Sequence, residues 1–134
     1  MQLMIVVAAA LVQGDGRVLL QQRPAGKAMA GLWEFPGGKV EPGEPPERAL
    51  ARELQEELAI VVTPSACTPL AFASQPLADR HLLLLLYALR HWVGEPSAVE
   101  AAALRWVTPA EMADLPMPPA DRPLVQALAA ALAG

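Results

Sequence analysis

Three glutamates in one short segment are the residues best suited to chemistry in this chain. Glu53, Glu56 and Glu57 follow Arg52 in the run Arg-Glu-Leu-Gln-Glu-Glu. On a helix they lie within about 100° of one another and share one face. Hard carboxylate oxygens grouped in this way bind Mg²⁺ or Mn²⁺, which would also relieve their mutual repulsion. An acidic helix face also occurs on ordinary solvated surfaces, and pairing of Arg52 with Glu56 four residues later fits that interpretation equally well.

The acidic residues of the chain are concentrated around this segment. Residues 34–57 hold seven of the fourteen acidic residues and three of the ten basic ones, so the formal charge of −4 lies within them. The sequence has no basic run, which argues against a nucleic acid polymer as partner. The apolar runs at 3–12 and 82–86 are too short to span a bilayer, so we expect no membrane partner. Cys67 is the only cysteine, and without a secretory signal it favours a reducing, cytoplasmic location.

A helix and the glycine pair before it must position the glutamates. Leu50, Leu54 and Leu58 form an apolar stripe, and two prolines fit the first turn, so we predict a helix from residue 46 to about residue 59. Upstream, Leu32–Phe35 predicts a short strand that ends at Pro36–Gly38. Two consecutive glycines there let the backbone bend sharply and approach a ligand closely.

The rest of the chain alternates strands and helices. Further strands are predicted for apolar runs bounded by turn residues, at 3–12, 17–23, 60–63, 70–74, 80–90 and 104–107. The first two, joined by Gln13–Gly16, predict a β-hairpin. Thr108–Glu111 has the pattern of a capping box, and a final helix is expected over 122–133 with Asp121 as its N-cap. We therefore predict one α/β (α+β) domain spanning residues 1–134.

Residues 38–60 resemble the Nudix box. The family pattern is Gly, five residues, Glu, seven residues, Arg-Glu, an aliphatic residue, any residue, Glu-Glu, any residue, Gly and an aliphatic residue. The chain matches from Gly38 through Glu44 and Arg52, and differs only at Ala59, where the family has glycine. That glycine helps the helix to end, so we expect Ala59 to tighten or shift the exit turn.

The resemblance implies a Nudix fold, a mixed β-sheet sandwiched between helices, and a Mg²⁺-dependent hydrolase (Mn²⁺ being a possible substitute). The implied metal ligands are the carbonyl of Gly37 and the carboxylates of Glu53, Glu56, Glu57 and Glu100. Glu53 and Glu100 are both candidates for the catalytic base, and the sequence leaves the choice open. Glu44 and Arg52 would orient the metal-binding face. Bound divalent cations would stabilise charge on phosphate oxygens and lower the pKa of bound water.

The similarity extends to MutT-type 8-oxo-dGTP diphosphatases. The matching blocks occur in the same order, at 22–24, 32–39, 79–81, 92–96 and 118–121. These enzymes sanitise the nucleotide pool for DNA replication and repair by cleaving an oxidised purine triphosphate, and dGTP, to the monophosphate and pyrophosphate. The resemblance implies phosphate contact by Arg23, base contact by Arg80, and a base pocket lined by Phe35 with Met4, Val6 and Ala8. The remaining implied substrate-binding residues are Gly38, Lys39 and Asp121.

Asp121 departs from the MutT pattern, which commonly has Asn. An amide both donates to O6 and accepts from N7–H of 8-oxoguanine, whereas an ionised Asp only accepts. CTP pyrophosphohydrolases share the Leu-Trp-Glu-Phe block and tend to carry Asp here, so a CTP or dCTP substrate, or a broader range of nucleotides, is the main alternative. The block Asp79-Arg80-His81 favours the MutT side.

Two alternatives lie outside catalysis. A non-catalytic Nudix domain could sense a nucleotide, but such domains usually lose box glutamates and this chain retains them all. An acidic scaffold protein would show no metal-dependent hydrolysis. We expect a monomer, with a dimer left open.

Overall fold

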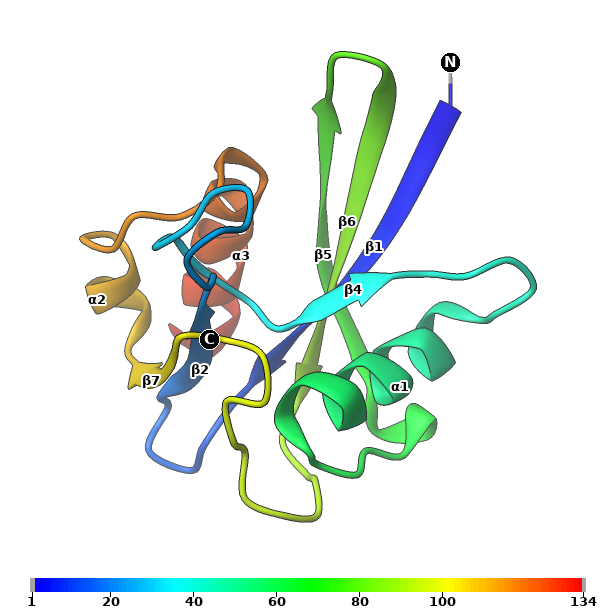
Figure 1. The fold of residues 1–134 in the computed structure, drawn as a ribbon. Coiled ribbons are helices and arrows are strands. Elements are labelled where there is room, and N and C mark those ends of the chain that lie inside the picture. The colour runs from blue at the N-terminus through cyan, green and yellow to red at the C-terminus, as the bar shows by residue number, and fades with distance from the viewer. Residues whose placement is uncertain (1, 134) are drawn as a thin grey trace.

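The computed structural model describes residues 2–133. Within this range the strands form two separate sheets. In the first sheet the strand order is β4 (Gly37–Lys39), β1 (Gln2–Leu11), β6 (Arg80–Leu89) and β5 (Thr68–Pro76). In the second it is β3 (Trp33–Glu34), β2 (Val18–Gln22) and β7 (Ala103–Val107). The helices are α1 (Pro46–Leu58), α2 (Pro109–Met112) and α3 (Arg122–Ala133), with short 3₁₀ turns at Pro64–Ala66 and Pro119–Asp121 (Figure 1).

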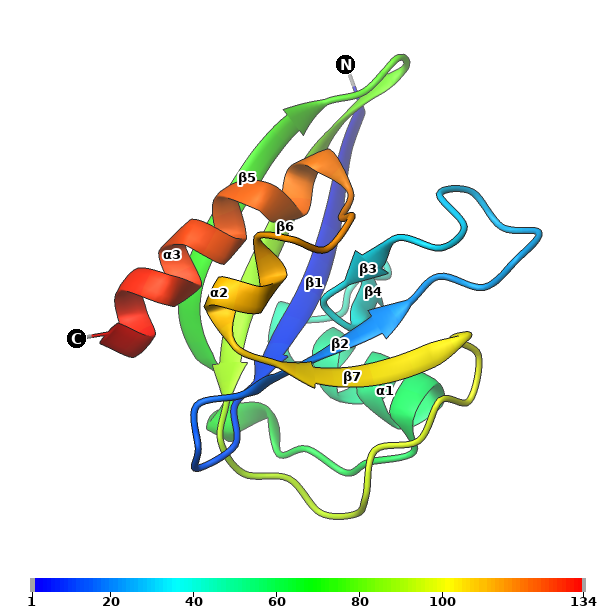
Figure 2. The same cartoon turned by 90° about the vertical axis from the view of Figure 1, so that its left-hand side faces the viewer.

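Strand β1 is the centre of the first sheet. It pairs antiparallel with β4 on one edge and parallel with β6 on the other, from Gln2 opposite Arg80 to Leu11 opposite Leu89. The sheet is therefore mixed, as predicted. The tip of the β5–β6 hairpin and the start of β1 extend together beyond the rest of the molecule (Figure 2).

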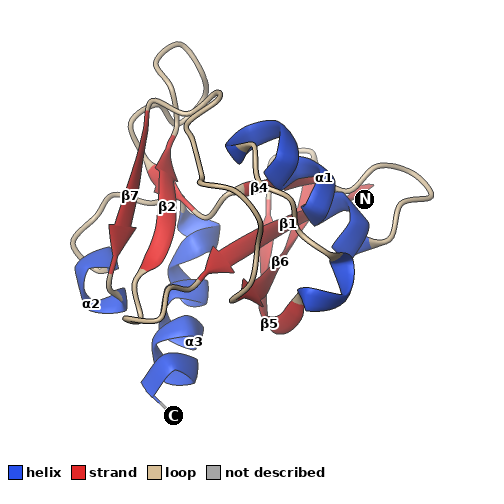
Figure 3. Cartoon of the chain, turned by 90° about the horizontal axis from the view of Figure 1, so that it is seen from below, coloured by secondary structure: helices blue, strands red, loops and turns tan. Residues whose placement is uncertain are grey.

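Alternate residues of β1 supply two hydrophobic cores. Val7, Ala9 and Leu11 pack with the apolar stripe of α1, whereas Ala8 and Ala10 belong to the core that α3 covers. This alternation follows from the two-residue period of a strand. Figure 3 shows α1 and α3 on opposite sides of β1 and β6, which confirms the predicted sandwich of sheet between helices. Among residues 2–133, the structure has no helix that combines the length and the apolar character needed to cross a membrane.

The prediction that the first two strands form a β-hairpin is wrong. The turn forms, with the N–H of Gln13 donating to the carbonyl of Arg17 at 2.9 Å, and Val12 bridges Val18. The strands then diverge into different sheets because β4 and β6 already occupy both edges of β1.

Two smaller expectations also differ. Residues 60–63 form only one isolated bridge, from Val61 to Val93. Gly37 and Gly38 do not simply end a strand, because they lie in β4 and pair with β1. The predictions at 70–74, 80–90 and 104–107 are confirmed as β5, β6 and β7, as is the capping box at Thr108.

Candidate functional site

Arg52 holds Glu44 of the preceding loop and Glu53 and Glu56 of α1 in a fixed arrangement. Its Nε and Nη2 donate to the two carboxylate oxygens of Glu44 at 2.8 and 3.0 Å. Its Nη1 donates to Glu53 at 2.9 Å and to Glu56 at 3.4 Å, so the predicted helix-face pair with Glu56 also forms. Nη2 also reaches the carbonyl of Lys39 at 3.1 Å, which ties α1 to β4. The Arg52 guanidinium lowers the pKa of Glu44 to about 2, and Glu44 in turn raises the pKa of Arg52.

Glu53 is packed directly against β4. A Cβ added to Gly38 would collide with its carboxylate, so glycine at this position leaves the space that the Glu53 carboxylate occupies. The Glu53 side chain is 16% exposed, and burial raises its pKa while Arg52 opposes the rise. Glu53 is thus a largely enclosed carboxylate with one fixed cationic neighbour.

Glu57 lies deeper at the same junction. Its carboxylate accepts the N–H of Gly37 at 3.1 Å and the side-chain amide of Gln21 at 3.5 Å. Burial and the nearby charge of Glu53 raise its pKa to about 8. Gly37 itself must be glycine, since its φ is +159° and a Cβ would meet the backbone of β1.

The glutamates suit a divalent cation whose remaining coordination positions are filled by water and substrate oxygens. Across residues 2–133, no three His, Cys, Asp or Glu side chains converge into a ready-made metal cluster. However, the charge of Glu53 raises the pKa of Glu57, and the charges of Glu56 and Glu100 raise the pKa of Glu53. Mg²⁺ retains water and shares phosphate oxygens, so an open carboxylate set of this kind suits it. The residues present are chemically appropriate for a divalent cation bound with substrate.

A cavity of about 470 Å³ adjoins this face. Its lining includes Glu57 and the exposed Glu100, together with Gln21, Arg23 and Lys27. The structure therefore brings Glu100 and Glu57 to the same cavity, although they come from distant segments.

A second cavity of about 400 Å³ has a largely apolar lining and is separated from the first by the ion pair of Arg23 and Glu34. Arg23 Nη1 meets Glu34 at 2.7 Å, and both residues line both cavities. Six residues of the predicted substrate site line the apolar cavity, namely Met4, Val6, Ala8, Phe35, Lys39 and Asp121. Gly38 and Arg80 line neither cavity. Phe35 is also 3% exposed and belongs to the α3-side core.

Asp121 does not cap α3 as predicted. It ends the 3₁₀ turn before α3, is 6% exposed, and accepts the backbone N–H of Phe35 at 3.3 Å. The N-cap prediction is wrong because the side chain points into the protein instead of toward the first turn of the helix. Burial raises the pKa of its carboxyl group to about 7.

Arg80 lies outside the wall of the apolar cavity. Its guanidinium meets Asp79 at 3.3 Å and the sulfur of Met4 at 3.5 Å, and Met4 in turn lines the cavity. Arg80 is therefore one residue removed from the space in which a base would bind.

Ala59 ends α1 in the left-handed conformation, with φ of 58° and ψ of 34°. Its N–H donates to the carbonyl of Gln55 at 3.1 Å. The exit turn is thus the one a glycine would make, and alanine adopts it at a conformational cost.

Glu34 and Gln21 are site residues that were not predicted from the sequence. Glu34 was noted only for its charge, yet it pairs with Arg23. Gln21 is 7% exposed and bonds to Glu57. A polar pair, Gln21-Gln22, at the end of an otherwise apolar strand was the available signal for the second.

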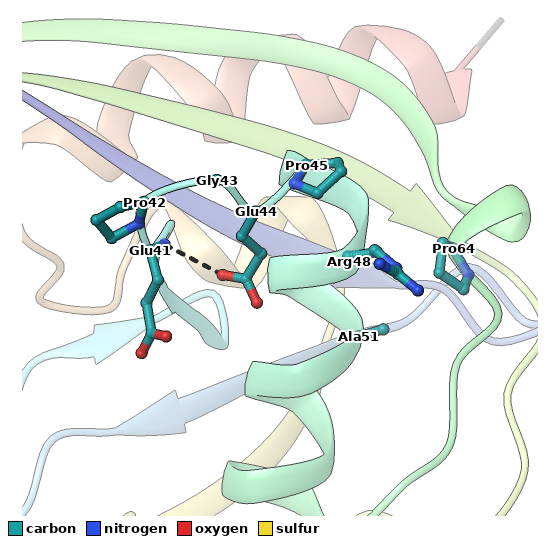
Figure 4. Close-up of a pocket in the computed structure, with 8 residues that line it drawn as sticks. All are labelled: Glu41, Pro42, Gly43, Glu44, Pro45, Arg48, Ala51 and Pro64. Atoms are coloured by element: carbon teal, nitrogen blue, oxygen red, sulfur yellow. Dashed lines mark hydrogen bonds between the residues drawn. The ribbon is translucent and has the colours of Figure 1, made fainter.

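A further cavity of about 510 Å³ belongs to the box loop and not to the glutamate face. Its walls are Glu41–Pro45, Arg48, Ala51 and Pro64 (Figure 4). The N–H of Glu41 donates to the Glu44 carboxylate at 3.1 Å across the loop, which keeps Glu44 in place for Arg52.

Comparison with known proteins identifies related chains of nearly equal length. The family model described as a NUDIX domain matches residues 7–127. A CTP pyrophosphohydrolase of Escherichia coli strain K12 is 43% identical over 127 residues, covering 95% of this chain and 93% of that protein. An 8-oxo-dGTP diphosphatase of Proteus vulgaris is 42% identical over 90 residues, covering 67% and 79%. The solution structure of the E. coli ORF135 protein superposes with a TM-score of 0.86 at 42% identity, covering 97% and 91%.

Proposed function

Because the chain belongs to the Nudix hydrolase family, we propose that it hydrolyses a nucleoside triphosphate to the monophosphate and pyrophosphate, with 8-oxo-dGTP as the preferred substrate. It is an enzyme of the diphosphatase type, and one water is consumed for each bond between phosphates that breaks. The proposal places it in the cytoplasm, as a single-domain monomer that removes oxidised nucleotides before DNA replication uses them.

The glutamate face is assigned the hydrolytic step. Glu53, Glu56, Glu57, Glu100 and the carbonyl of Gly37 would hold Mg²⁺. The bound cation would supply charge stabilisation on phosphate oxygens and an acidified water. Arg52 and Glu44 keep Glu53 in a single orientation.

Glu53 is the proposed base. It is a largely enclosed carboxylate whose pKa is raised by burial. A general base accepts a proton more effectively when its pKa lies closer to the working pH. Glu100 is exposed, lines the cavity together with Glu57, and remains the alternative.

We assign recognition of the substrate's nucleobase to the buried carboxyl group of Asp121. With a pKa of about 7, a protonated fraction is available at neutral pH. A protonated carboxyl group donates from one oxygen and accepts at the other, so it can pair with O6 and N7–H of 8-oxoguanine together.

A cytidine-type substrate is the second candidate. An ionised Asp121 would accept from the exocyclic amine of cytosine. The 43% identity to a CTP pyrophosphohydrolase favours this alternative.

A substrate panel separates the candidates. Pyrophosphate release with Mg²⁺ is measured for 8-oxo-dGTP, dGTP, dCTP and CTP at pH 7. The highest kcat/KM for 8-oxo-dGTP supports the proposal, whereas a dCTP or CTP preference overturns it in favour of the second candidate. Nucleotide binding without any hydrolysis would indicate the sensing domain instead.

A further inference from the structure

The loop that joins β2 to β3 reaches both cavities. Residues 24–31 follow Arg23, and Lys27 lines the cavity with Glu57 and Glu100 while Met29 lines the apolar cavity. In Figure 2 this loop projects from the ends of β2 and β3. One short segment thus contributes a cation to one compartment and a thioether to the other.

Local bonds hold the loop in shape. Gly31 N–H donates to the carbonyl of Arg23 at 3.0 Å, and the side chain of Gln22 donates to the carbonyl of Gly31 at 3.2 Å. Arg23 Nε donates to the carbonyl of Ala28 at 2.7 Å. Lys27 N–H closes a turn onto the carbonyl of Pro24 at 3.4 Å, with Gly26 supplying the positive φ of 83°. The backbone of Lys27 is therefore anchored at the rim of the cavity.

Arg23 already forms an ion pair within residues 2–133, whereas Lys27 does not. Arg23 is committed to Glu34 at 2.7 Å. Lys27 is exposed, and among the ion pairs of residues 2–133 none involves it. Its ammonium group is available to an anionic ligand that enters this cavity.

The positions of the two cavities indicate which anionic group would meet Lys27. With the nucleobase in the apolar cavity near Asp121, a triphosphate that extends past the Arg23–Glu34 pair, which lines both cavities, reaches Glu57. The distal phosphates then lie in the compartment that Lys27 lines. We propose that Lys27 binds the β- and γ-phosphates of the substrate, the part released as pyrophosphate. This inference rests on the proposed hydrolysis of a nucleoside triphosphate.

The kinetic test compares Lys27→Met, Lys27→Arg and Arg90→Met. Arg90 is an exposed cation that lines a different cavity, so its loss changes the net charge equally. We expect Lys27→Met to raise KM about 10-fold and weaken product inhibition by pyrophosphate as much, since a charged hydrogen bond is lost. Its kcat and inhibition by the monophosphate should change little. Lys27→Arg should restore the wild-type values, and Arg90→Met should keep them.

A binding measurement keeps the inference independent of turnover. Calorimetric titration of magnesium pyrophosphate into the wild-type chain and Lys27→Met should show weaker binding to the variant even if no triphosphate is hydrolysed, in which case only the proposed function fails. Equal pyrophosphate binding and equal KM in both chains would overturn the assignment of Lys27. So would an equal loss in Arg90→Met, because that result would indicate only long-range attraction.

Discussion

The carboxylate of Glu53 occupies the space that a Cβ on Gly38 would need, where α1 packs against β4. This contact fixes the distance of the proposed base from the strand that carries Gly37. The family motif begins with this glycine, and its role here is one of packing, since its φ is not in the left-handed region.

Gly38→Ala should therefore reduce activity while leaving the backbone conformation allowed. The new methyl group displaces the Glu53 carboxylate, and a shift of about 1 Å in a catalytic group lowers kcat on the order of 100-fold. Steady-state kinetics and circular dichroism would be recorded together. Gly14→Ala is the control, because a Cβ there meets open space. Full activity in Gly38→Ala would mean that the position of Glu53 is not critical.

Glu53→Gln should nearly abolish turnover without unfolding the protein. Glutamine keeps the volume of the side chain but loses the charge that would hold a cation and accept a proton, and loss of a general base costs about 10²- to 10⁴-fold in rate. The measurement is pyrophosphate release at saturating Mg²⁺, alongside Glu100→Gln and the exposed control Glu95→Gln. If Glu53→Gln is fully active and Glu100→Gln is not, the base is Glu100.

Arg52→Lys tests the orienting network. Lysine retains the charge but cannot bond to both oxygens of Glu44 and to Glu53 at once. Supporting residues of metal sites typically contribute 10- to 100-fold, so we expect the Mg²⁺ concentration for half-maximal activity to rise by about that factor. An unchanged metal requirement would limit Arg52 to a structural role.

Asp121→Asn should stabilise the protein more at high pH than at low pH. The pKa of Asp121 is raised from 3.8 to about 7, so the folded state binds a proton more tightly than the unfolded state, and stability falls as pH rises through this range. Asparagine does not titrate, so its advantage should grow between pH 4 and pH 7 to as much as about 4 kcal/mol and then level off. Urea unfolding at pH 4.5 and pH 8 measures this difference. A constant difference would show that Asp121 titrates normally.

Ala59→Gly should stabilise the end of α1. Ala59 adopts a φ of 58°, which glycine adopts without steric penalty, although glycine loses more freedom on folding. We expect a net gain of about 0.5–1 kcal/mol in the free energy of unfolding. The urea midpoint measures it, with Ala51→Gly inside the helix as a control that should be destabilising. A lower midpoint for Ala59→Gly would contradict the strain at this residue.

Local pattern predicted the elements of the site better than their long-range partners. The leucine stripe and prolines specified α1, and the spacing of Glu53, Glu56 and Glu57 specified their common face, because both follow from helical geometry alone. The hairpin of β1 and β2 failed because pairing with β4 and β6, far along the chain, competes for the same edges. Asp121 was misassigned for a similar reason, since its partner Phe35 lies 86 residues away.

The parallel pairing of β1 with β6 has a consequence for folding kinetics. Residues 12–79, which include the whole glutamate segment, form a loop that closes only when Gln2–Leu11 meets Arg80–Leu89. Loop closure over such a separation is entropically costly and slows folding. Gly37 and Gly38 are ordered by their pairing with the same β1, so the site should appear late, in one cooperative step with the sheet. The catalytic segment alone should therefore bind no nucleotide, because its geometry exists only after β1 and β6 have paired.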